Sequence, residues 1–286
     1  MGGWRPRAAG VLAAPLALVL AVGGCGAPRA EGPFIRPATA APSSAAAAPE
    51  VSPTPRTANL ASAQPTGPAA SLAPTRPSPK PSGPAYPYGA RGTTGTAAVA
   101  LTFDDGPTWT WTEQMLAVLR KHNVKATFCV LGKMARTYPT RIRQIVAEGH
   151  TLCNHSYDHN VKLGTLSEAE IRANLQATND AIRAAVPDAR ISYFRQPGGA
   201  WTPGVVKIAT ELGMTPLHWT VDPRDYTRPG AQAIADHVIS HTRPGSVVLL
   251  HDGGGDRSQT AEACRLMLPA LKSQFRLVAL PPRPAP

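Results

Sequence analysis

The chain has 286 residues and a formal net charge of +11. This length allows one or two domains. The basic residues are spread along the chain, without a long run of Lys and Arg and without alternation with aromatic residues. A nucleic-acid-binding surface is therefore not expected, and the positive charge favours solubility near an anionic surface.

The N-terminus has the three parts of an export signal. Arg5 and Arg7 precede an apolar run over residues 8–22, which is short for a membrane-spanning helix. Two small residues and Cys25 follow, a pattern that resembles a bacterial lipobox. We expect residues 1–25 to be a lipoprotein signal peptide and Cys25 to be lipidated, which would anchor the exported chain to the outer face of the cytoplasmic membrane through lipid only. The alternative is an ordinary signal peptide that contains a cysteine.

Residues 26–95 consist almost entirely of Ala, Pro, Ser, Thr and Gly. Such a segment cannot bury enough apolar surface to offset the entropy lost on ordering. We therefore expect a disordered, partly extended linker over residues 26–95 and one folded domain over residues 96–286.

Within that domain, short apolar runs alternate with amphipathic stretches, which predicts an α/β fold of parallel strands joined by helices. Strands are expected over residues 97–103, 125–131, 151–153, 191–194, 214–221, 246–251 and 276–280. Helices are expected over residues 110–122, 140–148, 203–212, 231–241 and 257–273, and one more from the capping box at Ser167 to Pro187. About seven βα units favour a barrel, closed or incomplete, with its active site at the carboxyl ends of the strands.

Two motifs at predicted strand ends indicate a metal site. Asp104 and Asp105 end the first strand, and two adjacent carboxylates resist joint ionisation unless a cation compensates them. His155 and His159 follow the third strand at a spacing that, on a helical turn, would bring both rings to one ion. Two histidines and one aspartate would leave positions on the metal open for water and substrate.

Three further motifs place polar residues at the same rim. Arg195 follows the predicted strand over residues 191–194 and precedes Gly198, whose backbone can approach an oxyanion. Asp222 follows the next strand, and His251 ends the apolar strand over residues 246–251. None of the three is decisive alone.

Taken in order, the five motifs resemble those of the polysaccharide deacetylases with a NodB-type domain (carbohydrate esterase family 4), over residues 97–280. The resemblance implies a distorted or incomplete (β/α)7 barrel that removes N-acetyl groups from cell-wall or chitin-like glycans. It implies that Asp104 is the general base, His251 the general acid, and Arg195 and Asp222 their respective partners. It further implies that Asp105, His155 and His159 bind a divalent metal, zinc or cobalt, and that Gly198, Leu249 and Trp201 contact the substrate.

The chain departs from the family pattern at two positions, Gly198 and Tyr226, where the family often has an aromatic residue and tryptophan. These changes affect the expected pocket walls and therefore the choice of glycan. Peptidoglycan is favoured because a lipid anchor and a long linker suit a polymer of the cell's own envelope. An O-acetyl esterase of xylan type and a non-catalytic wall-binding lipoprotein remain alternatives, and a monomer is expected.

Three cysteines remain in the predicted domain, and their spacing matches no zinc-finger pattern. In an oxidising compartment two of them can form a disulfide. Cys129 and Cys153 lie on predicted strands near the proposed site and are the favoured pair, with three separate thiols, including Cys264, as the alternative.

Overall fold

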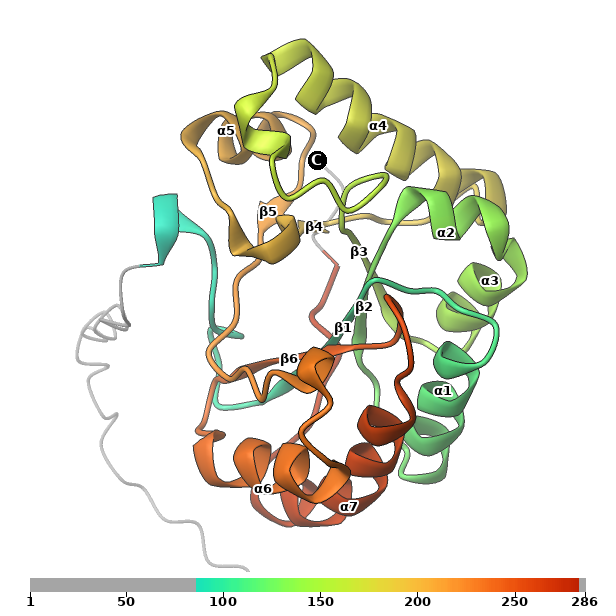
Figure 1. The fold of residues 1–286 in the computed structure, drawn as a ribbon, viewed down its shortest axis with the longest axis vertical. Coiled ribbons are helices and arrows are strands. Elements are labelled where there is room, and N and C mark those ends of the chain that lie inside the picture. Colours follow the sequence, from blue (N-terminus) through green and yellow to red (C-terminus); the bar gives the residue numbers. More distant parts are fainter. Residues whose placement is uncertain (1–85, 283–286) are drawn as a thin grey trace, which may run out of the picture. The chain divides into compact units, whose positions relative to one another are not determined.

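The computed structural model describes residues 86–282, so the predicted signal with Cys25 and most of the predicted linker lie outside the described residues. Within this range, parallel strands form one six-stranded sheet in the order β5-β4-β3-β2-β1-β6. The strands are β1 (Ala100–Asp104), β2 (Thr127–Val130), β3 (Thr151–Asn154), β4 (Tyr193–Phe194), β5 (Thr215–Pro216) and β6 (Val247–His251). The sheet curls, and helices cover its outer side (Figure 1).

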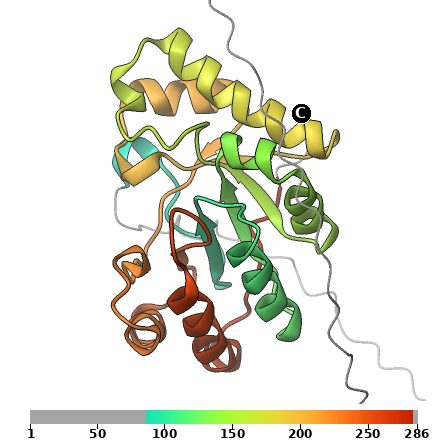
Figure 2. The same cartoon turned by 45° about the vertical axis from the view of Figure 1, so that its right-hand side comes forward.

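The connections between strands carry α-helices, as the alternating pattern predicts. They are α1 (Trp111–Lys121), α2 (Gly132–Thr137), α3 (Pro139–Ala147), α4 (Glu168–Ala185), α5 (Pro203–Glu211), α6 (Ala231–His241) and α7 (Ser258–Gln274). Helices α4 and α5 pack together on one side of the domain, and α6 and α7 on another (Figure 2). The predicted capping box is present, because the Ser167 side chain accepts from the Glu170 backbone and the Glu170 side chain accepts from Ser167. Over residues 86–282, no helix combines the length and apolarity needed to cross a membrane.

The sheet has one strand fewer than the sequence predicts. Leu277 forms only an isolated parallel bridge to Val99, so residues 276–280 are not a strand of the sheet. The strand predicted over residues 214–221 is reduced to Thr215–Pro216. Proline has no N–H to donate to a neighbouring strand, which limits regular pairing at this edge.

Isolated bridges join the two open edges of the sheet. Val221 pairs with Val248 beside β6, Arg91 pairs with Leu217 beside β5, and Thr93 pairs with Ser246. Residues 91–93 therefore lie between the two edge strands of the sheet, β5 and β6. The predicted linker boundary at residue 95 is wrong, since residues 86–95 belong to the folded domain. The predicted incomplete barrel is confirmed.

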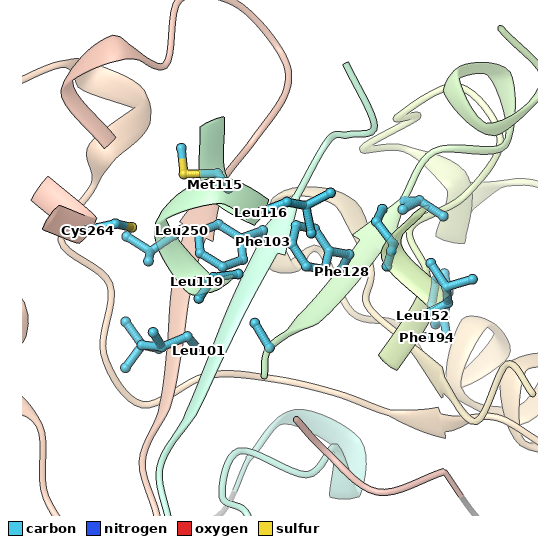
Figure 3. Packing of buried hydrophobic residues seen from close by; sticks show 14 of the residues in the cluster. Leu101, Phe103, Met115, Leu116, Leu119, Phe128, Leu152, Phe194, Leu250 and Cys264 are labelled. Atoms are coloured by element: carbon cyan, nitrogen blue, oxygen red, sulfur yellow. The ribbon is translucent and has the colours of Figure 1, made fainter. Parts of the chain in front are cut away.

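Side chains on the two faces of the sheet form separate cores. On the outer face, Leu101 and Phe103 of β1 pack against Leu116 and Leu119 of α1 (Figure 3). The inner face carries a smaller cluster. It contains one residue from each of β1, β2, β3, β4 and β6, one residue just after β5, and one from the C-terminal segment, namely Ala100, Cys129, Cys153, Tyr193, Leu217, Val247 and Leu280. Alternation along the strands places this second set inside the barrel.

Cys129 and Cys153 form a disulfide inside the barrel. The two residues are direct partners in the register of β2 and β3, so the bond links neighbouring strands. This confirms the favoured pair. Cys264 is a free, buried thiol on α7.

Candidate active site

The predicted catalytic residues meet at the carboxyl edge of the sheet. Asp104 ends β1, His251 ends β6, and the parallel register pairs these two residues directly. His155 follows β3 and Arg195 follows β4. They border or lie beneath a cavity of about 410 Å³. Its lining consists of Asp104, Asp105, His155, His159, Gln196, Gly198, Trp219, Asp222, Tyr226, Leu249 and His251.

Asp105, His155 and His159 are brought together as a potential metal site. Their ligand atoms all lie within 4.8 Å of one another. The Oδ1 atom of Asp105 lies 3.4 Å from His155 Nε2 and 3.3 Å from His159 Nε2. This oxygen is buried and has no hydrogen-bond partner among the described residues. A buried carboxylate oxygen facing two imidazole nitrogens fits a divalent cation.

The loop that carries the two histidines is not the helical turn that the sequence predicts. Ser156 and His159 adopt left-handed backbone conformations, with φ of 67° and 61°. The His155 ring is fixed by a 2.9 Å hydrogen bond between its Nδ1 and the Arg195 carbonyl. Because a carbonyl only accepts, this Nδ1 donates and Nε2 is left free to bind a metal.

Arg195 holds Asp104, as predicted. Its Nη1 donates to Asp104 Oδ1 at 2.7 Å and to Thr102 Oγ1 at 2.8 Å, and its side chain is fully buried. Its Nε donates to the Leu217 carbonyl at 3.3 Å. One oxygen of Asp104 is therefore tied to the guanidinium, while the other, Oδ2, lies 3.6 Å from His155 Nε2.

The partner of His251 is Asp225, and the prediction of Asp222 is wrong. Asp225 Oδ1 lies 2.7 Å from His251 Nδ1, and its Oδ2 accepts from the His251 backbone N–H and the Thr260 hydroxyl. Asp222 instead accepts from the backbone N–H of Arg224 at 2.8 Å. Asp222 still lines the cavity, but the His251 ring is hydrogen-bonded to Asp225 and not to Asp222.

Charge shifts the proton affinities of the site in two directions. Burial opposes ionisation of Asp105, but the close contact with His155 and the charges of His155, His251 and His159 outweigh it and lower its pKa. Burial disfavours the protonated form of His251, yet the hydrogen bond and charge of Asp225, with Asp104 and Asp105, raise its pKa to about 9. At neutral pH the site thus combines an ionised carboxylate with a protonated imidazole.

The predicted substrate contacts are only partly placed at the cavity. Gly198 and Leu249 line it. The prediction for Trp201 is wrong, because this side chain packs against Phe194 in the outer core and its Nε1 donates to His218 Nδ1 at 3.2 Å.

An aromatic residue that the sequence analysis missed, Trp219, lines the cavity instead of Trp201. Its ring packs against the glycines that follow Arg195, since a Cβ at Gly199 would come within 2.9 Å of it. Tyr226, at one of the two departures from the family pattern, meets the His251 ring edge-on with centroids 5.4 Å apart. Trp219 precedes the Asp222 motif by three residues, which is the signal that could have identified it.

Comparison with known proteins connects this geometry to a family. The sequence profile of polysaccharide deacetylase matches residues 91–217. A chitooligosaccharide deacetylase of Sinorhizobium fredii is 40% identical over 202 residues, covering 67% of this chain and 94% of that protein. Among solved structures, the Bc1960 peptidoglycan N-acetylglucosamine deacetylase has a TM-score of 0.63 at 35% identity, covering 66% of this chain and 89% of that one.

A carbohydrate esterase family 4 pseudoenzyme from Bacillus anthracis, BA3943, is similar as well, with a TM-score of 0.61 at 34% identity, over 67% of this chain and 66% of that one. Likeness to such a protein carries no activity by itself, so the catalytic groups must be present in the chain under study. Both the identities and the motifs at the strand ends lead to one assignment: the chain belongs to the polysaccharide deacetylase family, carbohydrate esterase family 4.

Proposed function

We propose that this protein is a metal-dependent hydrolase that removes N-acetyl groups from cell-wall or chitin-like glycans and releases acetate. The observation that carries the proposal is the pairing of Asp104 and His251 on neighbouring strands beside the Asp105, His155 and His159 cluster. Relatives named as chitooligosaccharide and peptidoglycan deacetylases support the reaction and its substrate class.

A divalent cation, zinc or cobalt, held by Asp105, His155 and His159 would polarise the acetyl carbonyl and lower the pKa of a bound water molecule. Asp104 accepts the proton of the attacking water, and its Arg195 contact keeps the carboxylate in place. The C–N bond breaks as protonated His251 gives its Nε2 proton to the departing sugar nitrogen. Its Nδ1 stays bound to Asp225 throughout. The Gly198 N–H, at the cavity wall, is the candidate donor to the oxyanion.

The preferred substrate within this class is peptidoglycan. The predicted lipid anchor at Cys25 and the predicted linker would hold the domain within reach of the wall. An O-acetyl ester requires nearly the same chemistry, so acetylated xylan is the substrate to compare. A purely wall-binding role is disfavoured because Asp104, Asp105, His155, His159 and His251 all line one cavity.

Acetate release by the metal-stripped mature chain, before and after zinc or cobalt is added, tests the reaction. Peptidoglycan, chitooligosaccharide and acetylated xylan serve as substrates. We expect metal-dependent release from an N-acetylated glycan, loss of release with Asp105→Ala, and a 10²–10⁴-fold lower rate with Asp104→Asn at normal metal content, the usual range for a positioned base. Metal binding without acetate release from any substrate would refute the proposed deacetylase activity. Turnover by Asp104→Asn at the parent rate would refute the assignment of Asp104 as the general base.

We also propose that the protein is an exported lipoprotein, monomeric, anchored outside the cytoplasmic membrane. The pattern at residues 1–25 and the Cys129–Cys153 disulfide, which suits an oxidising compartment, support this location. In cells fractionated after expression, Cys25→Ala should move the protein from the membrane to the soluble exported fraction. Equal membrane retention of both forms would rule out anchoring at Cys25.

A further inference from the structure

The two histidines of the proposed metal site are held in different ways. The buried His155 ring is fixed through its own Nδ1, which bonds to the Arg195 carbonyl. The His159 side chain is 40% exposed and lies 3.3 Å from Asp105. Among residues 86–282, its hydrogen bonding is limited to its backbone N–H, which donates to Ser156 Oγ at 3.1 Å. The position of the His159 ring therefore depends on the loop backbone that precedes it.

Helix α2 supports this loop from the carbonyl side. The backbone N–H groups of Gly132 and Lys133 donate to the carbonyls of Ser156 and Tyr157 at 3.0 and 2.9 Å. The contact is close, because a Cβ at Gly132 would lie 2.5 Å from Tyr157 Cδ2 and 2.8 Å from Thr178 Cα. These bonds fix residues 156–157 and leave Asp158, next to the ligand, to another element.

Helix α4 supplies the second support through Asn174. Its Oδ1 accepts from the Tyr157 backbone N–H at 2.8 Å, and its Nδ2 donates to Asp158 Oδ1 at 3.1 Å. One carboxamide thus bridges the two residues immediately before His159. An amide side chain has both an acceptor and a donor, whereas a carboxylate has no donor and alanine has neither.

We propose that Asn174 is a positioning residue for the metal ligand His159. The inference rests on the proposed metal site, and it adds a residue outside the five motifs that carry the family resemblance. Removing a group that orients a metal ligand typically costs 10–100-fold in metal affinity. We expect this loss at His159 rather than at His155, because the His159 ring makes no hydrogen bond of its own within the described residues.

The test compares metal affinity, measured by competition with a chromophoric zinc chelator, among variants of the mature chain. Asn174→Ala removes both hydrogen bonds and should weaken zinc binding 10–100-fold. Asn174→Asp should weaken it similarly, because it sets a carboxylate against Asp158. Combining Asn174→Asp with Asp158→Asn restores a donor–acceptor pair of reversed direction and should return the affinity to within about threefold of the parent, because the donor–acceptor bridge that orients the ligand is restored.

Gln176→Ala is the matched control, since it removes an exposed carboxamide from the same helix. It should leave zinc affinity unchanged. The visible absorption spectrum of the cobalt-loaded protein gives a second readout, because its bands follow ligand geometry. They should change with Asn174→Ala and return in the reversed pair.

Parent-like zinc affinity in Asn174→Ala, or a loss that the reversed pair does not rescue, would overturn the role of Asn174 while leaving the metal site intact. Weaker binding with rescue in a protein that releases no acetate would uphold Asn174 and refute the deacetylase. A parent chain that binds neither zinc nor cobalt would overturn both proposals.

Discussion

The carboxylate of Asp225 makes three hydrogen bonds although none of the residue reaches solvent. Two come from His251 and one from Thr260, so both oxygens of the buried carboxylate have hydrogen-bond partners. Although burial disfavours the protonated ring, the hydrogen bond and charge of Asp225 raise the pKa of His251 to about 9. The acid of the proposed reaction is therefore prepared by a residue that never touches the substrate cavity.

Replacing this carboxylate should change the pH profile in a defined direction. A general acid works only while protonated, so the activity that depends on His251 is present below about pH 9 and lost above it. Asp225→Asn preserves shape but removes the charge that raises the pKa, so the alkaline limb of kcat/KM should move at least about one unit to lower pH. After a shift of about one unit most of the acid is still protonated at pH 7, so the loss of rate should be small at neutral pH and largest near pH 9.

Asp222→Asn is the matched control, since this carboxylate lines the cavity without contacting His251. It should leave the alkaline limb in place, whatever it does to KM. An alkaline limb that moves with Asp222→Asn and stays with Asp225→Asn would contradict the assignment.

The residue-scale predictions succeeded where a motif fixes chemistry locally. Residue type and order at strand ends were enough to bring Asp104, Asp105 and Arg195 into one site. The choice between Asp222 and Asp225 was not available from order alone. It depends on the left-handed backbone at Arg224, with φ of 54°, and on Thr260, which is 35 positions from Asp225 in the sequence.

At the scale of elements, the disulfide joins β2 and β3 next to the proposed metal site. Cys153 stands two residues before the ligand His155, and Cys129 is the register partner of Asp104. The bond closes a loop with a sequence separation of 24 residues. Loop-closure entropy for such a length corresponds to about 3 kcal/mol of stabilisation.

Removing the bond by Cys129→Ala with Cys153→Ala should lower the free energy of unfolding by about 3 kcal/mol, measured by urea denaturation. Cys264→Ala, at a buried thiol that forms no disulfide, is the control, and should cost less than half as much, because it removes only packing. If the control is as destabilising as the double change, packing rather than the covalent link accounts for the loss.

Elements were predictable where periodicity or capping is local. The helix over residues 231–241 was placed as observed, and the capping box located the start of α4. Helix α2 was missed because its six residues are too few to establish a helical period. The strand predicted over residues 214–221 was too long, since its pairing beyond Pro216 is made by isolated bridges to distant segments.

At the scale of the whole domain, the curled sheet was predictable from alternating strands and helices, but its closure was not. Two segments that complete it come from the ends of the described chain. Residues 91–93 bridge toward the edges at Leu217 and Ser246, although their composition resembles the linker before them. The C-terminal segment pairs with Val99 and places Leu280 among the inner residues of the barrel. Such partners are set by tertiary contact rather than local pattern.

This closure by both ends has a consequence for the order in which the chain matures. The backbone N–H of Leu280 donates to Thr127 across 153 positions of sequence. Contacts of that span form only after the intervening chain is available. During synthesis, strands β1 to β6 therefore leave the ribosome before the segment around Leu280 that completes the inner side of the barrel.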